Sequence, residues 1–231
     1  MRLAVLASGE GSIFQSIVDH VKLGVLRGVE VTLLISNKRD SRALLRAERS
    51  GVKSLCVDNR LENNVKLPFS EVEEKIIKSL KDHDIDLVFL TGWNKILDRV
   101  VDEYPYRIMN THPSLLPAFS GLFGIEVHRA VLSHGCKITG CTIHFVDKGV
   151  DTGPIIIQRA VEVREDEVVE SLAERVKSVE KLVVPMAIQL YRDSRISLTR
   201  REGRVYAKVD YSGGWLETWN ERQKTYTSHI E

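Results

Sequence analysis

Short apolar runs alternate with helix-like segments through the first half of the chain, and this alternation limits the folds that it can adopt. Residues 2–7, 29–35 and 85–92 are apolar and stop at glycine or polar residues, as buried strands do. Between them, residues 13–26 space apolar side chains like one face of a helix, and residues 42–51 end at a glycine typical of helix C-termini. Strands alternating with helices predict right-handed crossovers and a mostly parallel sheet with helices on both faces.

The chain between these elements continues the same pattern. Residues 52–57 and 106–110 predict two further strands, and the polar, poorly patterned residues 59–69 predict a loop. Ser70 stands three residues before Glu73, which is the spacing of a capping box and predicts that a helix starts there. The fold class expected from the whole pattern is α/β, with an open, twisted, mostly parallel sheet.

The second half of the chain changes character. Residues 140–147 and 153–163 are rich in β-branched residues with no helical segment between them, which predicts an antiparallel edge in the C-terminal half. Residues 166–194 form a long amphipathic pattern, and we expect a helix that is bent or interrupted near Pro185.

The last part of the chain differs again. Residues 196–210 predict a hairpin with its turn at 201–203, followed by a polar tail that is docked or frayed. We therefore expect a main domain over residues 1–195 and a C-terminal hairpin and tail over residues 196–231.

Composition narrows the class of protein. The formal net charge of +1 gives no overall field for nucleic acid or an anionic membrane, and no apolar stretch is long enough to span a bilayer. The three cysteines, Cys56, Cys136 and Cys141, are odd in number and lack zinc-site spacing. We expect a cytoplasmic protein that binds no metal, nucleic acid or membrane, as a monomer or homodimer.

Three predicted loops meet at one edge of the expected sheet. Residues 8–12, 91–97 and 110–117 each follow a strand, and open parallel sheets bind ligands at the carboxyl ends of their strands. The glycines of residues 8–12 permit close approach of a phosphate to helix N–H groups, although a plain tight turn explains them equally well. The segment is neither a Walker A sequence nor a full G-x-G-x-x-G motif.

Asn110 and His112 are the strongest candidates for chemistry. Side chains two apart on an extended chain point the same way, so both can face one cleft, and Pro113 restricts His112 to extended geometry. An amide beside an imidazole suits an oxyanion site, whereas a lone buried histidine is more often structural. Asp147 or Asp151 can supply an acid that favours the imidazolium form of His112, and spacing alone does not choose between them.

Several stretches of the sequence resemble those of a known family. The stretch N-T-H-P-S-L-L-P at 110–117, followed by G-C-T-I-H-F-V-D-K-G-V-D-T-G-P-I-I at 140–156, is similar to the folate-dependent formyltransferases. L-A-S-G-E-G-S at 6–12 and L-T-G-W-N-K-I-L at 90–97 are placed as in that family. The resemblance covers about residues 1–195 and implies the Rossmann-like formyltransferase fold.

The resemblance also implies a reaction. The formyl group of 10-formyltetrahydrofolate would pass to the amine of glycinamide ribonucleotide, a step of purine biosynthesis. Asn110 and a protonated His112 would stabilise the oxyanion, and Asp151, rather than Asp147, would keep His112 charged.

Binding roles follow from the same resemblance. Gly11 and Ser12, with Ile13 beside them, would hold the substrate phosphate, and Glu180 would contact the ribose. The folate pocket would be lined by residues of two segments, namely Trp93, Asn94, Lys95, Ile96, Leu97, Val146 and Asp147.

The sequence departs from the family at positions that bear on substrate binding. Ile13 replaces the usual Asn, Asn94 and Lys95 replace Met and Arg, and Lys181 replaces a common His. A related formyltransferase with another amine acceptor, such as methionyl-tRNA or an amino sugar or nucleotide, is therefore the alternative. A non-catalytic module that binds nucleotide or folate is a second alternative.

Overall fold

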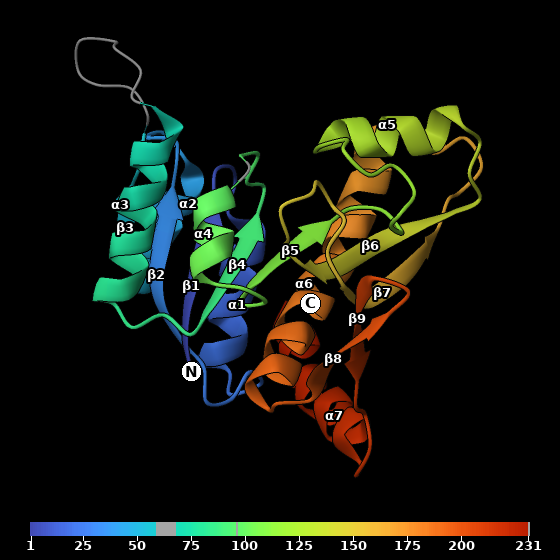
Figure 1. Ribbon diagram of the computed structural model, residues 1–231. Helices are drawn as coiled ribbons and strands as arrows, with labels where there is room; N and C mark the ends of the chain where they lie inside the picture. Colours follow the sequence, from blue (N-terminus) through green and yellow to red (C-terminus); the bar gives the residue numbers. More distant parts are fainter. Residues whose placement is uncertain (59–67, 96, 231) are drawn as a thin grey trace.

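A seven-stranded sheet runs through the computed structural model, which describes residues 1–58, 68–95 and 97–230 (Figure 1). Most of the loop expected at residues 59–69 lies outside this part of the chain. The strands are β1 (Arg2–Ala7), β2 (Glu30–Ser36), β3 (Lys53–Cys56), β4 (Leu87–Thr91), β5 (Ile108–His112), β6 (Ile138–Phe145) and β7 (Ile155–Glu162).

The strand order β3-β2-β1-β4-β5-β6-β7 reverses direction along the sheet between β1 and β4. The five strands from β3 to β5 are parallel, whereas β6 pairs antiparallel with both β5 and β7. The expected mostly parallel sheet with an antiparallel edge is thus confirmed. A reversal of strand order opens a crevice at the carboxyl ends of the flanking strands, which marks the usual ligand site of such sheets.

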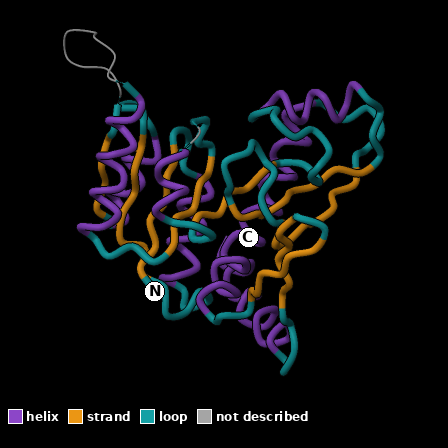
Figure 2. The backbone as a smooth tube through the Cα atoms, viewed as in Figure 1, coloured by secondary structure: helices purple, strands orange, loops and turns teal. Residues whose placement is uncertain are grey.

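Helices cover both faces of the sheet (Figure 2). They are α1 (Ser12–Lys22), α2 (Arg42–Ser50), α3 (Phe69–Asp82), α4 (Asp98–Glu103), α5 (Ile125–Ser133), α6 (Val169–Arg192) and α7 (Trp215–Ile230). One hydrophobic cluster joins the sheet to α1, α2, α5, α6 and α7, and a second joins the opposite face to α3 and α4. Every helix of the described residues is too short or too polar to span a bilayer.

A helix starts at the place that Ser70 predicts, but neither the capping box nor an interruption at Pro185 is found. No side chain caps α3, which begins at Phe69 after Pro68, so the capping box does not form. Glu73 instead accepts a hydrogen bond of 2.8 Å from the backbone N–H of Arg99, which lies in the first turn of α4. Because that N–H has no partner within its own helix, Glu73 satisfies it. The interruption expected near Pro185 is absent, since α6 continues through it as one helix of 24 residues.

The end of the chain is docked. β8 (Ile196–Arg201) and β9 (Arg204–Val209) form the expected hairpin, and the polar tail forms α7. Trp219 of α7 is fully buried, Tyr226 stacks on His20 of α1 at 3.7 Å between ring centroids, and Gln223 donates to the carbonyl of Leu182 in α6. Helix α7 therefore ties α1 to α6. The division of domains at residue 195 stays a prediction.

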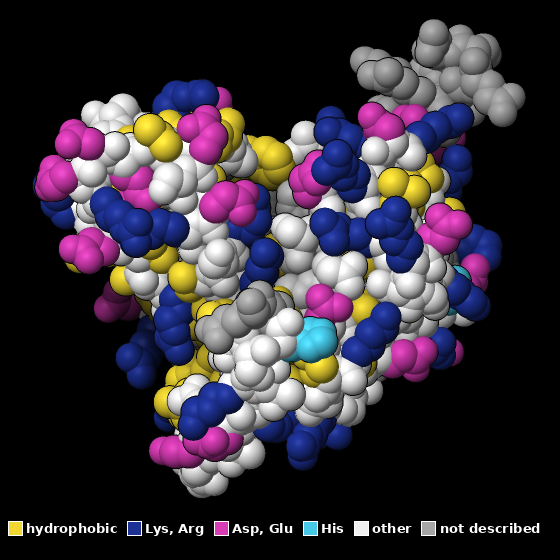
Figure 3. Space-filling view, turned by 180° about the vertical axis from the view of Figure 1, so that it is seen from behind, with side chains coloured by type: hydrophobic (Ala, Val, Ile, Leu, Met, Phe, Trp, Pro, Cys, Tyr) yellow, Lys and Arg dark blue, Asp and Glu magenta, His cyan; other side chains and the backbone are white. Residues whose placement is uncertain are grey.

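Charges of both signs are mixed on the surface. On the face seen in Figure 3, Lys and Arg side chains are interspersed with Asp and Glu side chains. This pattern agrees with the net charge of +1.

Truncation of Trp219 is expected to destabilise the protein. Trp219→Ala removes a fully buried ring and leaves a cavity in the hydrophobic cluster to which α7 belongs, so the free energy of unfolding should fall by about 3–5 kcal/mol. Urea denaturation measures the loss, and Lys224→Ala on the exposed side of the same helix is the matched control. A loss no larger than that of the control would show that α7 is not packed as described.

Stability is also expected to depend on the protonation of His20. Burial lowers the pKa of His20 from 6.5 to about 4, against the opposing hydrogen bond to Ser16 and the charge of Asp19. Below pH 6.5 the unfolded chain therefore binds a proton that the folded protein takes up only near pH 4, so the free energy of unfolding falls as pH drops through this window. His20→Phe should remove roughly 3 kcal/mol of that fall. Urea denaturation at pH 4.5 and 7 measures it, and an equal fall in both proteins would contradict the account.

Candidate active site

A cavity of about 660 Å³ opens at the carboxyl ends of β1, β4 and β5. Its walls include residues from all three loops that the sequence places at this edge, namely 8–12, 91–97 and 110–117. The cavity therefore lies where the strand order reverses, and further side chains from α5, α6 and the β6–β7 loop complete it.

Asn110 and His112 lie on one side of β5. The strand expected at residues 106–110 runs to His112 in the structure, so both residues belong to the strand itself rather than to the loop that follows it. Their spacing of two places them on the same face, and Thr111 between them points to the other. His112 is buried, and both side chains line the cavity.

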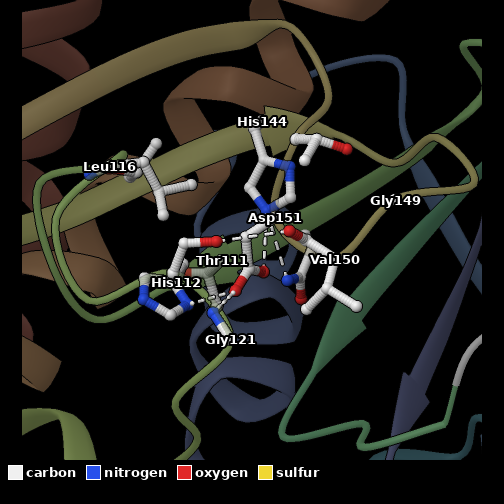
Figure 4. A network of polar contacts seen from close by, with 12 residues as sticks. Thr111, His112, Leu116, Gly121, His144, Gly149, Val150 and Asp151 are labelled. Atoms are coloured by element: carbon white, nitrogen blue, oxygen red, sulfur yellow. Dashed lines mark hydrogen bonds and ion pairs between the residues drawn. The ribbon is translucent and has the colours of Figure 1, made fainter.

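Asp151 lies beside His112, and Figure 4 shows the two side chains turned toward one another. The distance from Nδ1 of His112 to Oδ2 of Asp151 is 3.3 Å, and the backbone N–H of Gly121 donates to the same oxygen at 3.0 Å. Asp147 instead accepts hydrogen bonds from the backbone of Gly149 and the hydroxyl of Thr152. Of the two acids left open by spacing, Asp151 is the one placed at the histidine.

Close packing of the β6–β7 loop helps to place Asp151. A Cβ atom added to Gly153 would lie 1.8 Å from the carbonyl oxygen of Phe145, so glycine is required where the loop returns to the sheet. Asp151 itself has a φ of +56°, a conformation that costs energy in a residue with a side chain. The surrounding contacts therefore hold the aspartate in a strained geometry.

The structure opposes the charged form that is expected of His112. Burial lowers the pKa of His112 below its ordinary value, and this effect exceeds the opposing influence of Asp151 and of the Phe119 carbonyl. The neutral imidazole is therefore favoured at pH 7. A neutral ring with its proton on Nδ1 donates to Asp151 and leaves Nε2 as a proton acceptor.

His144 was missed by the sequence reasoning and lies opposite Asn110 in the β5–β6 ladder. Its Nδ1 lies 2.8 Å from the carbonyl of Phe145, and its Nε2 lies 3.3 Å from Nδ2 of Asn110. Burial lowers the pKa of His144, so the ring is neutral, with Nδ1 donating and Nε2 accepting. His144 thus fixes the orientation of the Asn110 amide and leaves one of its hydrogens for a ligand. Only the register of the antiparallel pair could have revealed this.

The start of α1 forms a second region of the cavity. Gly11 has a φ of +69°, and a Cβ atom there would lie 2.7 Å from the backbone of Ala43, so the position requires glycine. No side chain caps the helix that begins at Ser12, and its backbone N–H groups at the cavity edge suit an anion. Ile13 also lines the cavity, although it is almost wholly packed into the core.

Helices α5 and α6 close this region with charged and polar side chains. Glu180 is buried and lines the cavity. Two residues that the sequence reasoning missed, Lys177 and His128, also line it. Nδ1 of His128 is buried without a hydrogen-bond partner in the described chain, and burial lowers the pKa of its ring, with Lys177 adding to the effect.

The opposite region of the cavity combines apolar and polar side chains. The residues expected to line a folate pocket and found in its walls are Trp93, Asn94, Lys95, Leu97, Val146 and Asp147. Trp93 and Leu97 are buried, whereas Ile96 lies outside the described residues. Nowhere in the described residues do three or more His, Cys, Asp or Glu side chains gather in a group that could hold a metal.

Comparison with known proteins agrees with this arrangement. The phosphoribosylglycinamide formyltransferase of Bacillus subtilis (strain 168) is 35% identical over 190 residues, which make up 81% of this chain and 93% of that protein. The crystal structure of glycinamide ribonucleotide transformylase 1 from Symbiobacterium toebii matches with a TM-score of 0.79 at 37% identity, covering 90% of this chain and 93% of that one.

Longer relatives also match. The trifunctional purine biosynthetic protein adenosine-3 of Homo sapiens is 36% identical over 198 residues, which are 85% of this chain. The chain covers 19% of the length of that protein. The family model described as formyl transferase matches residues 1–188. With that match over most of its length, and with the fold and cavity described above, the chain belongs to the formyl transferase family.

Proposed function

We propose that the protein transfers the formyl group of 10-formyltetrahydrofolate to the amine of glycinamide ribonucleotide in purine biosynthesis. The observation that carries the proposal is the convergence of Asn110, His112 and Asp151 at a cavity of this fold. The names of the Bacillus subtilis and Symbiobacterium toebii relatives support the choice of acceptor.

The amide of Asn110 is suited to stabilise the charge that develops on the formyl oxygen. When bound, 10-formyltetrahydrofolate supplies an activated formyl group, and attack by the amine moves negative charge onto its oxygen. Because Nε2 of His144 holds one hydrogen of Nδ2, the second is free to donate to that oxygen. A donor fixed before the reaction needs no reorganisation in the transition state.

His112 and Asp151 are suited to move the proton. As the new C–N bond forms, the attacking amine must lose a proton, and a neutral imidazole can take it up. The carboxylate of Asp151 stabilises the resulting imidazolium at 3.3 Å. The pair then gives the proton to the leaving nitrogen as the old C–N bond breaks, so the transfer balances without a covalent enzyme intermediate.

The two regions of the cavity divide the substrates between them. The uncapped N-terminus of α1, with Gly11 and Ser12, is suited to the phosphate of the nucleotide, and Glu180 to its ribose. The wall formed by Trp93, Leu97 and Val146 is suited to the flat ring system of the folate. The reacting groups then meet between the regions, beside His112.

A different amine acceptor is the second candidate. It is favoured by Ile13, which places an apolar side chain beside the anion site. As part of the proposal, the protein acts in the cytoplasm on small-molecule substrates, as a monomer or homodimer without nucleic-acid or membrane partners. The free cysteines support a reducing compartment.

Titration calorimetry and a turnover assay together test the function. Glycinamide ribonucleotide and a folate analogue should each bind to the purified protein, and the nucleotide should be formylated when 10-formyltetrahydrofolate is added. Binding of both ligands without turnover would instead favour the non-catalytic module, and turnover with another amine alone would favour the second candidate.

Loss of Asn110 or His112 is expected to abolish most of the activity. Asn110→Ala and His112→Ala should each lower kcat by about 10²–10³-fold, because each removes a group aimed at the reacting atoms. Steady-state kinetics with both substrates measures the loss, and His229→Ala, an exposed histidine near the end of α7, is the matched control. Near-normal turnover by His112→Ala in a protein of unchanged circular dichroism would overturn the mechanism.

Removal of the Asp151 charge is expected to change the pH profile. Asp151 raises the pKa of His112, so Asp151→Asn should lower that pKa further. Activity that depends on neutral His112 is lost as pH falls through this pKa. The acid limb of kcat/KM should therefore move to lower pH, and the plateau value of kcat/KM should fall. A limb that moves to higher pH would contradict the assignment of His112 as proton acceptor.

A further inference from the structure

Thr111 makes a contact that the proposed reaction does not use. The residue lies between Asn110 and His112 on β5, so its side chain is on the other face of the strand. Its hydroxyl Oγ1 donates a hydrogen bond of 2.5 Å to Oε1 of Glu180 in α6. Both side chains are buried, and both residues line the cavity.

The contact matters because Glu180 is a buried carboxylate without a close cation. In the described residues, no Lys, Arg or His nitrogen lies within 4.0 Å of its oxygens, and Lys177, one turn away on the same helix, pairs with Glu174. A buried carboxylate is costly unless it is hydrogen-bonded. The hydroxyl of Thr111 is thus a close donor that holds this carboxylate in place.

We propose that Thr111 is a positioning residue for the acceptor: its hydroxyl fixes one oxygen of Glu180 and leaves the other for a hydroxyl of the sugar. The inference rests on the proposed function, in which Glu180 contacts the ribose of the nucleotide. One strand then serves both substrates, because β5 presents Asn110 and His112 from one face and sets Glu180 from the other. The distance between the anchored sugar and the reacting groups is fixed across a single strand.

The same hydrogen bond affects the charge of Glu180. Burial raises the pKa of this carboxyl, while the Thr111 hydroxyl and, at longer range, Lys177 lower it. Loss of the hydroxyl should therefore raise the pKa further, so the ionised form, whose free oxygen accepts a sugar hydroxyl, is lost at a higher pH. The other titratable groups near Glu180 are the adjacent Lys181 on α6 and Cys141 on β6, and His112 on β5 and His128 on α5 line the same cavity.

Kinetics of Thr111 variants test the positioning role. Thr111→Val keeps the shape and removes the hydroxyl, so KM for glycinamide ribonucleotide should rise roughly tenfold, as expected for loss of a hydrogen bond to a charged group. The kcat and the KM for 10-formyltetrahydrofolate should stay within about twofold, since neither depends on that bond. Thr111→Ser, which restores the hydroxyl, should behave like the wild type. An unchanged KM for the nucleotide in a folded Thr111→Val protein would overturn the proposal.

A double variant separates positioning from a general structural effect. In the Glu180→Ala background, Thr111→Val should add little to the rise in KM, because the acceptor of the Thr111 hydroxyl is already absent. Equal effects in the two backgrounds would show that Thr111 acts on the cavity by another route, and would also overturn the proposal. If Thr111→Val lowers stability, thermal unfolding measures that loss separately. The comparison of KM values in the two backgrounds then still decides whether Thr111 acts through Glu180.

Carbon-13 NMR of labelled Glu side chains gives a readout that does not depend on turnover. Glu180→Gln identifies the carboxyl signal by its disappearance, and Thr111→Val should move its titration midpoint to higher pH, whereas Thr111→Ser should not. If the wild type fails to formylate glycinamide ribonucleotide, the proposed function is wrong, and the carboxyl titration still decides whether Thr111 holds Glu180.

Discussion

Strand β5 pairs with parallel β4 on one side and antiparallel β6 on the other, and the site depends on this change of direction. The parallel side brings the loops after β1 and β4 to the same edge of the sheet as the end of β5. The antiparallel side places His144 opposite Asn110, and the loop after β6 brings Asp151 to His112. The side chains that face the cavity thus come from distant parts of the chain because one strand has two kinds of neighbour.

Burial decides the charges within the site. It lowers the pKa of both His112 and His144 despite the aspartate between them, and it raises the pKa of Glu180. A neutral His144 can accept from Asn110, and a neutral His112 can take a proton from an amine. Removal of water strengthens the hydrogen bond that the fixed amide of Asn110 can donate, and it also keeps His112 neutral and able to accept a proton. Both effects therefore have one physical cause.

The fold and part of the candidate site could be predicted from the sequence alone. Alternating strand and helix patterns predicted the sheet and the shared edge of its loops, and the spacing of two predicted that Asn110 and His112 face the same way. The choice of Asp151 over Asp147 came from the resemblance, since both acids lie in one loop and only packing separates them.

The rest depended on contacts between elements far apart in the sequence. The roles of His144 and Thr111 follow from strand register and from the packing of α6 on β5, which local patterns do not encode. The neutral state of His112 follows from its burial in the folded protein. Glu73 had the right spacing for a capping box, but the backbone of α4 competes for its carboxylate.

The central claim is that the carbonyl carbon passes directly from the folate to an amine held at the cavity. It is tested by following ¹³C-labelled formyl from 10-formyltetrahydrofolate by NMR in the presence of glycinamide ribonucleotide and purified protein. The account predicts that the label appears in the formamide of the nucleotide at the rate at which the folate is consumed, and that Asn110→Ala and His112→Ala slow both together. Release of the label as free formate, with the nucleotide unchanged, would contradict it.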